Sequence, residues 1–544
     1  MAPHADLIIL GGSVVTVDDA RPEAEALAVR GGRIAAVGDE ADIRALAGPG
    51  TEIVDLAGGC LLPGFVEAHS HPISLALSQD GPVRDIRPAT VPDADAVLAA
   101  IRRAVADAEA ADDGTGAYLY GWDGLLQKGL EEPTRDWLDS LSPARPLVIL
   151  TNSGHAAYAN TAALAAAGIT RDTPDPAGGH FARDDAGEPT GKAYEGAAIG
   201  MLAGPVLKRM ADIAGPTLKA TLAGLNRVGI TTVSDMAFHA ARRPFLDALA
   251  AGGELTARLR LYEVSDARLA SEVPLANGDD MVRQVGIKTW VDGSPWNGNI
   301  ATSFPYLDTH ATRAVLGLPC DHRGGTNYDK DAYRAIAAAY FAQGWQLACH
   351  AQGDISIDLV LDVWEELLAA ADPDDGRARR LRLEHCGAMT PAQYTRAGRL
   401  GITCSLFAAH IRYWGEVLVD DLFGAPAETW VAARSAVDAG VRISLHNDSP
   451  VTPADPLGNI ATAVTRRTRA GRVLAPEQHL TVDEALRAQT LDAAWQLHAD
   501  DIIGSLTPGK YADLVILSED PRRVAPEDIA EIEIRATYLE GRRV

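Results

Sequence analysis

The segment LPGFVEAHSH (residues 62–71) predicts a short, apolar β-strand that ends in two histidines. His69 and His71 are two positions apart, so on a strand both imidazoles point to the same side. Two imidazoles on one side can share a metal ion. The two histidines of a His-x-His pair can also be purely structural. Whether this pair binds a metal therefore depends on which other residues of the chain lie beside it.

Seven further segments have the same strand-like character. Ala- and Leu-rich stretches such as DKDAYRAIAAAYFAQ (329–343) separate them, which is typical of repeated βα units around a parallel sheet. With the first segment they make eight strands, the number that closes a (β/α)8 barrel. The seven are GITTVSDM (229–236), ARLRLYEV (257–264), VGIKTWVDG (285–293), GWQLACHA (344–351), RLRLEHC (380–386), GITCSLF (401–407) and GVRISLHND (440–448).

The spacing of these strands also predicts the domain organisation. A structureless loop of about 150 residues between the first two strands is implausible, so residues 75–225 are predicted to form an inserted subdomain. That insert has strands of its own, AYLYGW (117–122) and RPLVILTNSG (145–154). Both chain ends contain short β-branched runs broken by glycines. The predicted α/β fold is therefore a distorted (β/α)8 TIM barrel (63–495) with a small β-sandwich domain from residues 1–62 and 496–544.

Composition limits the classes of partner. The net charge of −25 disfavours nucleic acid and anionic membrane surfaces as partners. No apolar run of about 18 residues and no secretory leader is recognisable. The five cysteines are scattered without a CxxC motif, as in reduced intracellular proteins. These features predict a cytoplasmic protein that acts on a small molecule, and they leave a homodimer open.

Side chains that bind metals recur where the predicted strands end. In a closed barrel these ends converge on one face, where barrel enzymes have their active sites. A set of unrelated structural histidines is improbable at so many equivalent positions, so the sequence predicts a metal centre. The candidate ligands are His69, His71, Lys288, His350, His385 and Asp448.

Lys288 allows two interpretations. A lysine inside an apolar strand is costly unless it is paired or modified. It could be a snorkelling lysine or an ion-paired one, with Asp292 as a candidate partner. Alternatively, the uncharged amine could react with CO2, and the resulting carbamate would be an anionic, two-oxygen ligand able to bridge two metals.

The motifs FVEAHSHP, GITTVSDM, IKTWVDGSP, CHAQGD, LEHC and HNDSPVTPADPLGNIATAVTRRTRAG resemble the amidohydrolase superfamily. More narrowly, they resemble its YtcJ-like branch (amidohydrolase family 3), which includes N-substituted formamide deformylases. The resemblance implies one or two divalent metals, with two zinc ions as the predicted cofactors. It implies that His69, His71 and Asp448 bind the more buried metal, that His350 and His385 bind the second, and that a carboxylated Lys288 bridges them.

The same resemblance favours hydrolysis of a C–N amide bond, of an N-formyl or N-acyl amide. Deaminases of the superfamily have His-x-x-Glu after the fifth strand, whereas this chain has His350-Ala-Gln-Gly-Asp354, so deamination ranks lower. Asp448 is the predicted general acid and base. Hydrolysis of a carbamate, a cyclic imide or an ester is the alternative for the same site. A non-catalytic metal-binding barrel is the alternative from another class of protein.

Further residues are predicted around this centre. His155, in NSGHAAYAN of the insert, could stabilise an oxyanion or could simply be a loop histidine bonded to backbone. Glu384 is predicted to point to the opposite face of its strand from His385 and to be structural. Side chains near the motif loops are predicted to contact substrate, with simple packing as the alternative for each. They are Trp122, Trp296, His410 and His446, with Trp290 and Trp414 nearby.

Overall fold

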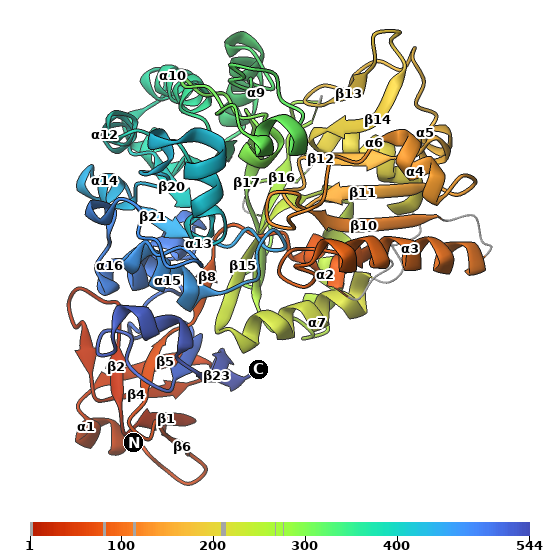
Figure 1. Ribbon diagram of the computed structural model, residues 1–544. Coiled ribbons are helices and arrows are strands. Elements are labelled where there is room, and N and C mark those ends of the chain that lie inside the picture. Colours follow the sequence, from red (N-terminus) through yellow and green to blue (C-terminus); the bar gives the residue numbers. More distant parts are fainter. Residues whose placement is uncertain are drawn as a thin grey trace.

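The computed structural model of the chain describes residues 4–79, 83–111, 116–207, 214–266, 268–271, 273–275 and 277–544. Within these ranges, eight parallel strands form one sheet that makes a nearly closed barrel (Figure 1). Each strand overlaps one predicted segment, so the distorted (β/α)8 barrel is confirmed. In sheet order they are β21 (Ile443–Leu445), β20 (Thr403–Leu406), β19 (Arg382–His385), β18 (Gln346–Ala351), β17 (Val282–Trp290), β16 (Arg258–Val264), β15 (Ile230–Phe238) and β8 (Phe65–Glu67).

Two hydrogen bonds join the chain just past the first and last strands, where the sheet itself does not close. The backbone N–H of His71 donates to the carbonyl of Ser449 over 2.8 Å. The N–H of Asn447 donates to the carboxylate of Glu67, the last residue of β8, over 2.9 Å. The chain following β8 is therefore held against the chain following β21, which brings the two ends of the barrel sequence to one place.

The predicted first strand is divided between two sheets. Its first two residues belong to β7 (Cys60–Pro63), and β8 begins only at Phe65. Gly64 lies between the two strands, where an added Cβ would come within 2.3 Å of the Thr231 hydroxyl. The chain can change sheets here because glycine allows this close approach.

Helices lie outside the barrel (Figure 1) and begin where the sequence has capping residues. The helix α9 (Lys330–Ala342) follows Asp329, whose side chain accepts the N–H of Ala332. The helix α12 (Pro391–Leu400) begins with a capping box, in which the side chain of Thr390 and that of Gln393 bond to each other's backbone N–H. The helix α9 coincides with the predicted helical stretch at residues 329–343.

Both ends of the chain contribute to one six-stranded sheet. The strand β22 (Leu514–Leu517) pairs with β7 on one side and with β23 (Ile534–Leu539) on the other. A four-stranded sheet that includes β1 (Leu7–Leu10) and β4 (Ala26–Arg30) shares an apolar core with it. Figure 1 shows the N- and C-termini at the same end of the molecule. The exact boundaries at residues 62 and 496 stay predictions.

The long segment between β8 and β15 contains a second six-stranded sheet, beside the barrel in Figure 1. Its strands include β10 (Ala117–Trp122), β11 (Leu147–Thr151), β12 (Ala156–Ala159) and β14 (Pro189–Tyr194), and the segment also contains the helix α3 (Ala94–Ala111). The predicted insert limits, 75 and 225, stay predictions. Among the described residues, no helix has the length and apolar character that crossing a membrane requires.

Candidate active site

The carboxyl ends of the barrel strands bring the six predicted ligands to one place. All six are buried or nearly buried, with Lys288 only 1% exposed. His69 and His71 follow β8, Lys288 is in β17, His350 is in β18, His385 ends β19 and Asp448 follows β21.

One group of ligands consists of His69, His71 and Asp448. Oδ1 of Asp448 lies 3.3 Å from Nε2 of His69 and 3.1 Å from Nε2 of His71. The three donor atoms are close enough together to surround one ion. The two histidines lie beyond the end of β8 and not on the strand itself, so strand alternation is not what makes them converge. The hydrogen bond from His71 to Ser449 holds them there.

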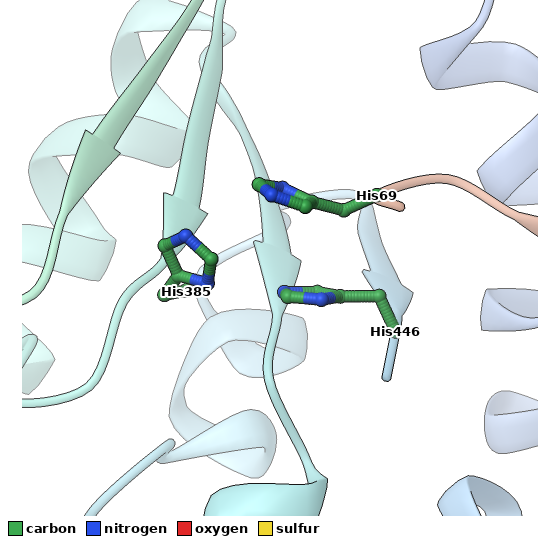
Figure 2. A group of neighbouring side chains, drawn as sticks. All are labelled: His69, His385 and His446. Carbon is green, nitrogen blue, oxygen red and sulfur yellow. The ribbon is translucent and has the colours of Figure 1, made fainter. Parts of the chain in front are cut away.

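A second group consists of His69, His385 and His446 (Figure 2). The rings of His69 and His446 are stacked, with centroids 4.6 Å apart and planes 18° apart. His385 lies beside both, 4.6 Å from His69 and 5.1 Å from His446 between centroids. Neither ring nitrogen of His446 has a hydrogen-bond partner among the described residues, and Nδ1 of His385 has none there either.

Lys288 and His350 are the remaining two of the six predicted ligands. Nζ of Lys288 lies 3.4 Å from Nε2 of His69. His350 donates from Nε2 to the carbonyl of Gly293 over 2.6 Å, and its ring centroid is 4.4 Å from that of His385. No ion pair joins Lys288 and Asp292 in the described part of the chain, and the Asp292 carboxylate accepts the backbone N–H groups of Gln352 and Gly353. The ion-pair interpretation of Lys288 and Asp292 is therefore wrong.

Burial shifts the pKa of several groups in this cluster. It lowers the pKa of His350, His385 and His446 well below the usual value for histidine. It also lowers the pKa of Lys288 to about 8, against the raising effect of Glu384 and Asp448. Neutral imidazoles are the form that binds metals.

The prediction that Glu384 points away from the site is wrong. Its Oε2 accepts Nδ1–H of His69 over 2.5 Å, and the buried guanidinium of Arg382 bonds the same carboxylate over 2.9–3.0 Å. Burial alone raises the pKa of Glu384, but Arg382 and His69 hold it well below its usual value. Strand alternation is interrupted at His385, whose φ is 70°, and the following Cys386 also has a positive φ.

The chain therefore turns at the end of β19, and His385 as well as Glu384 can face the centre. The Glu384 carboxylate orients His69 so that Nε2 is the free ligand atom. Two charges two positions apart in the apolar run RLRLEHC were the sequence signal for this buried pair.

The insert contributes His155 to the barrel mouth. The residue directly precedes β12, and its ring centroid lies 4.7 Å from that of His350. Its Nδ1 lies 2.8 Å from Oε2 of Glu195. Burial tends to lower the pKa of His155, but Glu195, together with Asp448 and Asp292, raises it overall. Nothing in the sequence indicated Glu195, which is 40 residues further along the chain.

Aromatic side chains continue outward from the histidines. Phe407 lies between His446 and His410, with ring centroids 4.8 Å and 4.1 Å away. His410 makes an edge contact with Trp296, which stacks on Trp414 at 4.8 Å. Three of the predicted substrate-binding residues, Trp296, His410 and His446, are therefore joined to the centre in one row of rings.

Trp122 is not part of this row. It belongs to the apolar cluster of the insert, where its ring centroid lies 6.0 Å from that of Trp137. The residue that contacts the barrel from the end of β10 is the neighbouring Asp123. Its carboxylate accepts Nε1–H of Trp414 over 3.2 Å. The structure therefore places Trp122 in the packing of the insert, the alternative that the sequence left open.

The donor set fits a divalent metal. It combines buried neutral imidazoles with a carboxylate, as in protein sites for zinc and similar ions. The nitrogens of His69 and His350 that would not bind metal are already held by Glu384 and by the Gly293 carbonyl, which is the usual arrangement around a metal-binding histidine.

Comparisons with known proteins identify the family of the chain. The amidohydrolase family model matches residues 52–544. Over 548 residues the chain is 30% identical to an N-substituted formamide deformylase of Arthrobacter pascens, covering 99% of this chain and 98% of that protein. It is 28% identical to the putative amidohydrolase YtcJ of Bacillus subtilis over 551 residues, 98% of each chain.

Among solved structures, an uncharacterized metal-dependent hydrolase from Pyrococcus horikoshii OT3 has the same fold, with a TM-score of 0.72 and 23% identity. The match covers 96% of this chain and 99% of that one. The branch indicated by the motifs is confirmed. The family match over nearly the whole chain and the deformylase relative establish the assignment, and this chain is a hydrolase of the amidohydrolase family.

Proposed function

We propose that this hydrolase depends on a divalent metal and cleaves the C–N bond of a small N-formyl or N-acyl amide. The observation that carries the proposal is the contact of one Asp448 oxygen with Nε2 of both His69 and His71, while Glu384 holds the opposite nitrogen of His69. The donor atoms of His69, His71 and Asp448 therefore lie around one point, close enough together to hold one metal ion. The deformylase relative supports the choice of an amide.

The proposed cofactors are two zinc ions. His69, His71 and Asp448 would hold one, His350 and His385 would hold the other, and a carboxylated Lys288 would bridge them. Bound metal would supply a Lewis acid for the substrate carbonyl and would lower the pKa of water. A carbamate on Lys288 would place its oxygens beside Nε2 of His69, which is 3.4 Å from Nζ.

The residues of the chain then have separate roles. Asp448 accepts the proton of the attacking water and passes it to the leaving amine. His155 donates a hydrogen bond to the oxyanion that develops on the carbonyl. The row of rings from His446 to Trp296 forms an apolar wall that orients the substrate and excludes water.

A substrate panel tests the proposal. Amides, carbamates, cyclic imides and esters with matched leaving groups are assayed with the purified chain, after chelation, and after zinc is added back. We expect N-formyl or N-acyl amides to be hydrolysed fastest, with activity lost on chelation and restored by zinc. Faster turnover of another bond class would assign that class to the site. Binding of metal without turnover of any class would indicate a non-catalytic barrel.

Lys288→Ala tests the bridging carbamate separately. We expect this variant to lose most of its turnover and to regain part of it when a short carboxylic acid such as acetate or propionate is added, because the acid can replace the two carbamate oxygens. Rates are measured over a series of acid concentrations. His71→Ala is the matched control, since a free carboxylic acid cannot replace a terminal imidazole. An unmodified Lys288 ammonium in a metal-loaded crystal structure would rule out the bridge.

A further inference from the structure

Glu195 has an unusual backbone conformation at a buried position. It is the first residue of α6 (Glu195–Leu207), directly after β14, and only 4% of it is exposed. Its φ of 64° is in the left-handed region, which is unfavourable for a residue with a side chain. Such strain persists where surrounding contacts hold it, and it is found preferentially at functional sites.

The contacts of Glu195 are with His155 on one side and with the barrel on the other. Oε2 accepts Nδ1–H of His155 over 2.8 Å, and the backbone N–H of Glu195 donates to the carbonyl of His155 over 3.0 Å. Oε1 accepts the side-chain amide of Asn299 over 2.5 Å. Both carboxylate oxygens are therefore used, and His155 is held by both its ring and its backbone.

Asn299 extends this network to a proposed metal ligand. Its backbone carbonyl accepts the N–H of Gly293 over 3.0 Å, and the carbonyl of Gly293 in turn accepts Nε2–H of His350 over 2.6 Å. A Cβ on Gly293 would lie 2.4 Å from Oε1 of Glu195 and 2.2 Å from the Asn299 amide, so this close packing requires glycine. The network runs from His155 to His350, whose rings are themselves neighbours.

We propose that Glu195 is a positioning residue for catalysis. It fixes His155 with Nδ1–H bonded to the carboxylate, so that Nε2–H of the doubly protonated ring, which has no hydrogen-bond partner among the described residues, is presented to the substrate beside His350. The insert is thereby part of the active site, and Asn299 holds the pair against the barrel. This inference rests on the proposed hydrolysis, in which His155 contacts the oxyanion.

A double-mutant cycle separates this role from a structural one. We expect His155→Ala to lower kcat about 10²–10³-fold, as for loss of one oxyanion donor. Glu195→Gln should lower kcat about 10–100-fold with little change in KM, as for loss of an outer partner of a functional histidine. Because Glu195 acts through His155, the double variant should be no slower than His155→Ala alone. Metal content should be unchanged throughout.

Glu132→Gln is the matched control, since it removes another carboxylate of the insert, the one that pairs with Lys192. We expect it to leave kcat unchanged. If Glu195 only holds the insert against the barrel, the effect of Glu195→Gln on kcat should add to the effect of His155→Ala. Glu195→Gln should then also lower the metal content or the melting temperature. Additive effects or an unchanged kcat in Glu195→Gln would overturn the proposal.

A spectroscopic measurement decides the positioning independently of turnover. Nitrogen-15 NMR of histidine-labelled protein, with the His155 signal assigned by its absence in His155→Ala, reports whether each ring nitrogen carries a proton. We expect protons on both Nδ1 and Nε2 in the wild type and a changed signal in Glu195→Ala. An identical signal in both would refute the role of Glu195. A wild type that hydrolyses no amide would instead refute the proposed function, while the NMR signal would still show whether Glu195 positions His155.

Discussion

His69→Ala, His350→Ala and His385→Ala are each expected to lose bound metal and nearly all hydrolytic activity. His69 contributes to both clusters of potential ligands, and His350 and His385 are neighbours in contact with the same centre. Burial lowers the pKa of His350 and His385, so both are uncharged imidazoles, the form that binds metal. Elemental analysis of the purified variants, beside steady-state rates, measures both effects.

Two further variants show whether the loss is specific. His479→Ala removes a half-buried imidazole that is hydrogen-bonded to the carbonyl of Thr465 and is not among the predicted ligands, so metal and activity should be retained. Glu384→Gln keeps the size of the side chain that orients His69, and it should weaken metal binding about 10–100-fold without abolishing it. Wild-type metal content in His69→Ala or His385→Ala would contradict the assignment of the centre.

Asp448→Asn is expected to fold, to retain part of its metal and to lose at least about a hundredfold in turnover. Asparagine keeps one coordinating oxygen but cannot accept a proton at neutral pH. Asp448 could instead serve only to cap the turn that follows, but its carboxylate faces His69 and His71. The turn is closed by its backbone carbonyl, which accepts the N–H of Val451 over 2.8 Å.

Turnover of the best substrate in the panel and thermal melting curves, measured together, test this expectation. Asp455→Asn is the control, because the Asp455 side chain caps α15 (Pro456–Thr465) by accepting the N–H of Gly458 and asparagine can do the same. A folded Asp448→Asn protein with near-native turnover would remove Asp448 from the mechanism.

The barrel and its ligand positions could be predicted because they depend on local patterns. Strand-like runs alternating with helical ones specify βα units, and a closed barrel places all strand ends on one face. The polar residues at the ends of segments 62–71, 344–351 and 440–448 therefore had to meet, whatever the detailed packing. Helix starts at Asp329 and Thr390 were likewise set by adjacent capping residues.

The tertiary structure alone decided which neighbours surround these ligands. Strand alternation predicted that Glu384 points to the opposite face of the strand from His385. The positive φ of His385 turns the chain, and no pattern in the sequence predicts that turn. Trp122 was expected near substrate, yet it packs in the core of the insert.

The Glu195 carboxylate bonds His155, 40 residues earlier in the chain, and Asn299, 104 residues later. Local preferences specify the elements and the residues at their ends. Long-range packing decides instead where a side chain points once the strand has ended, and which residue of a distant loop it contacts. No local stretch of sequence encodes that packing.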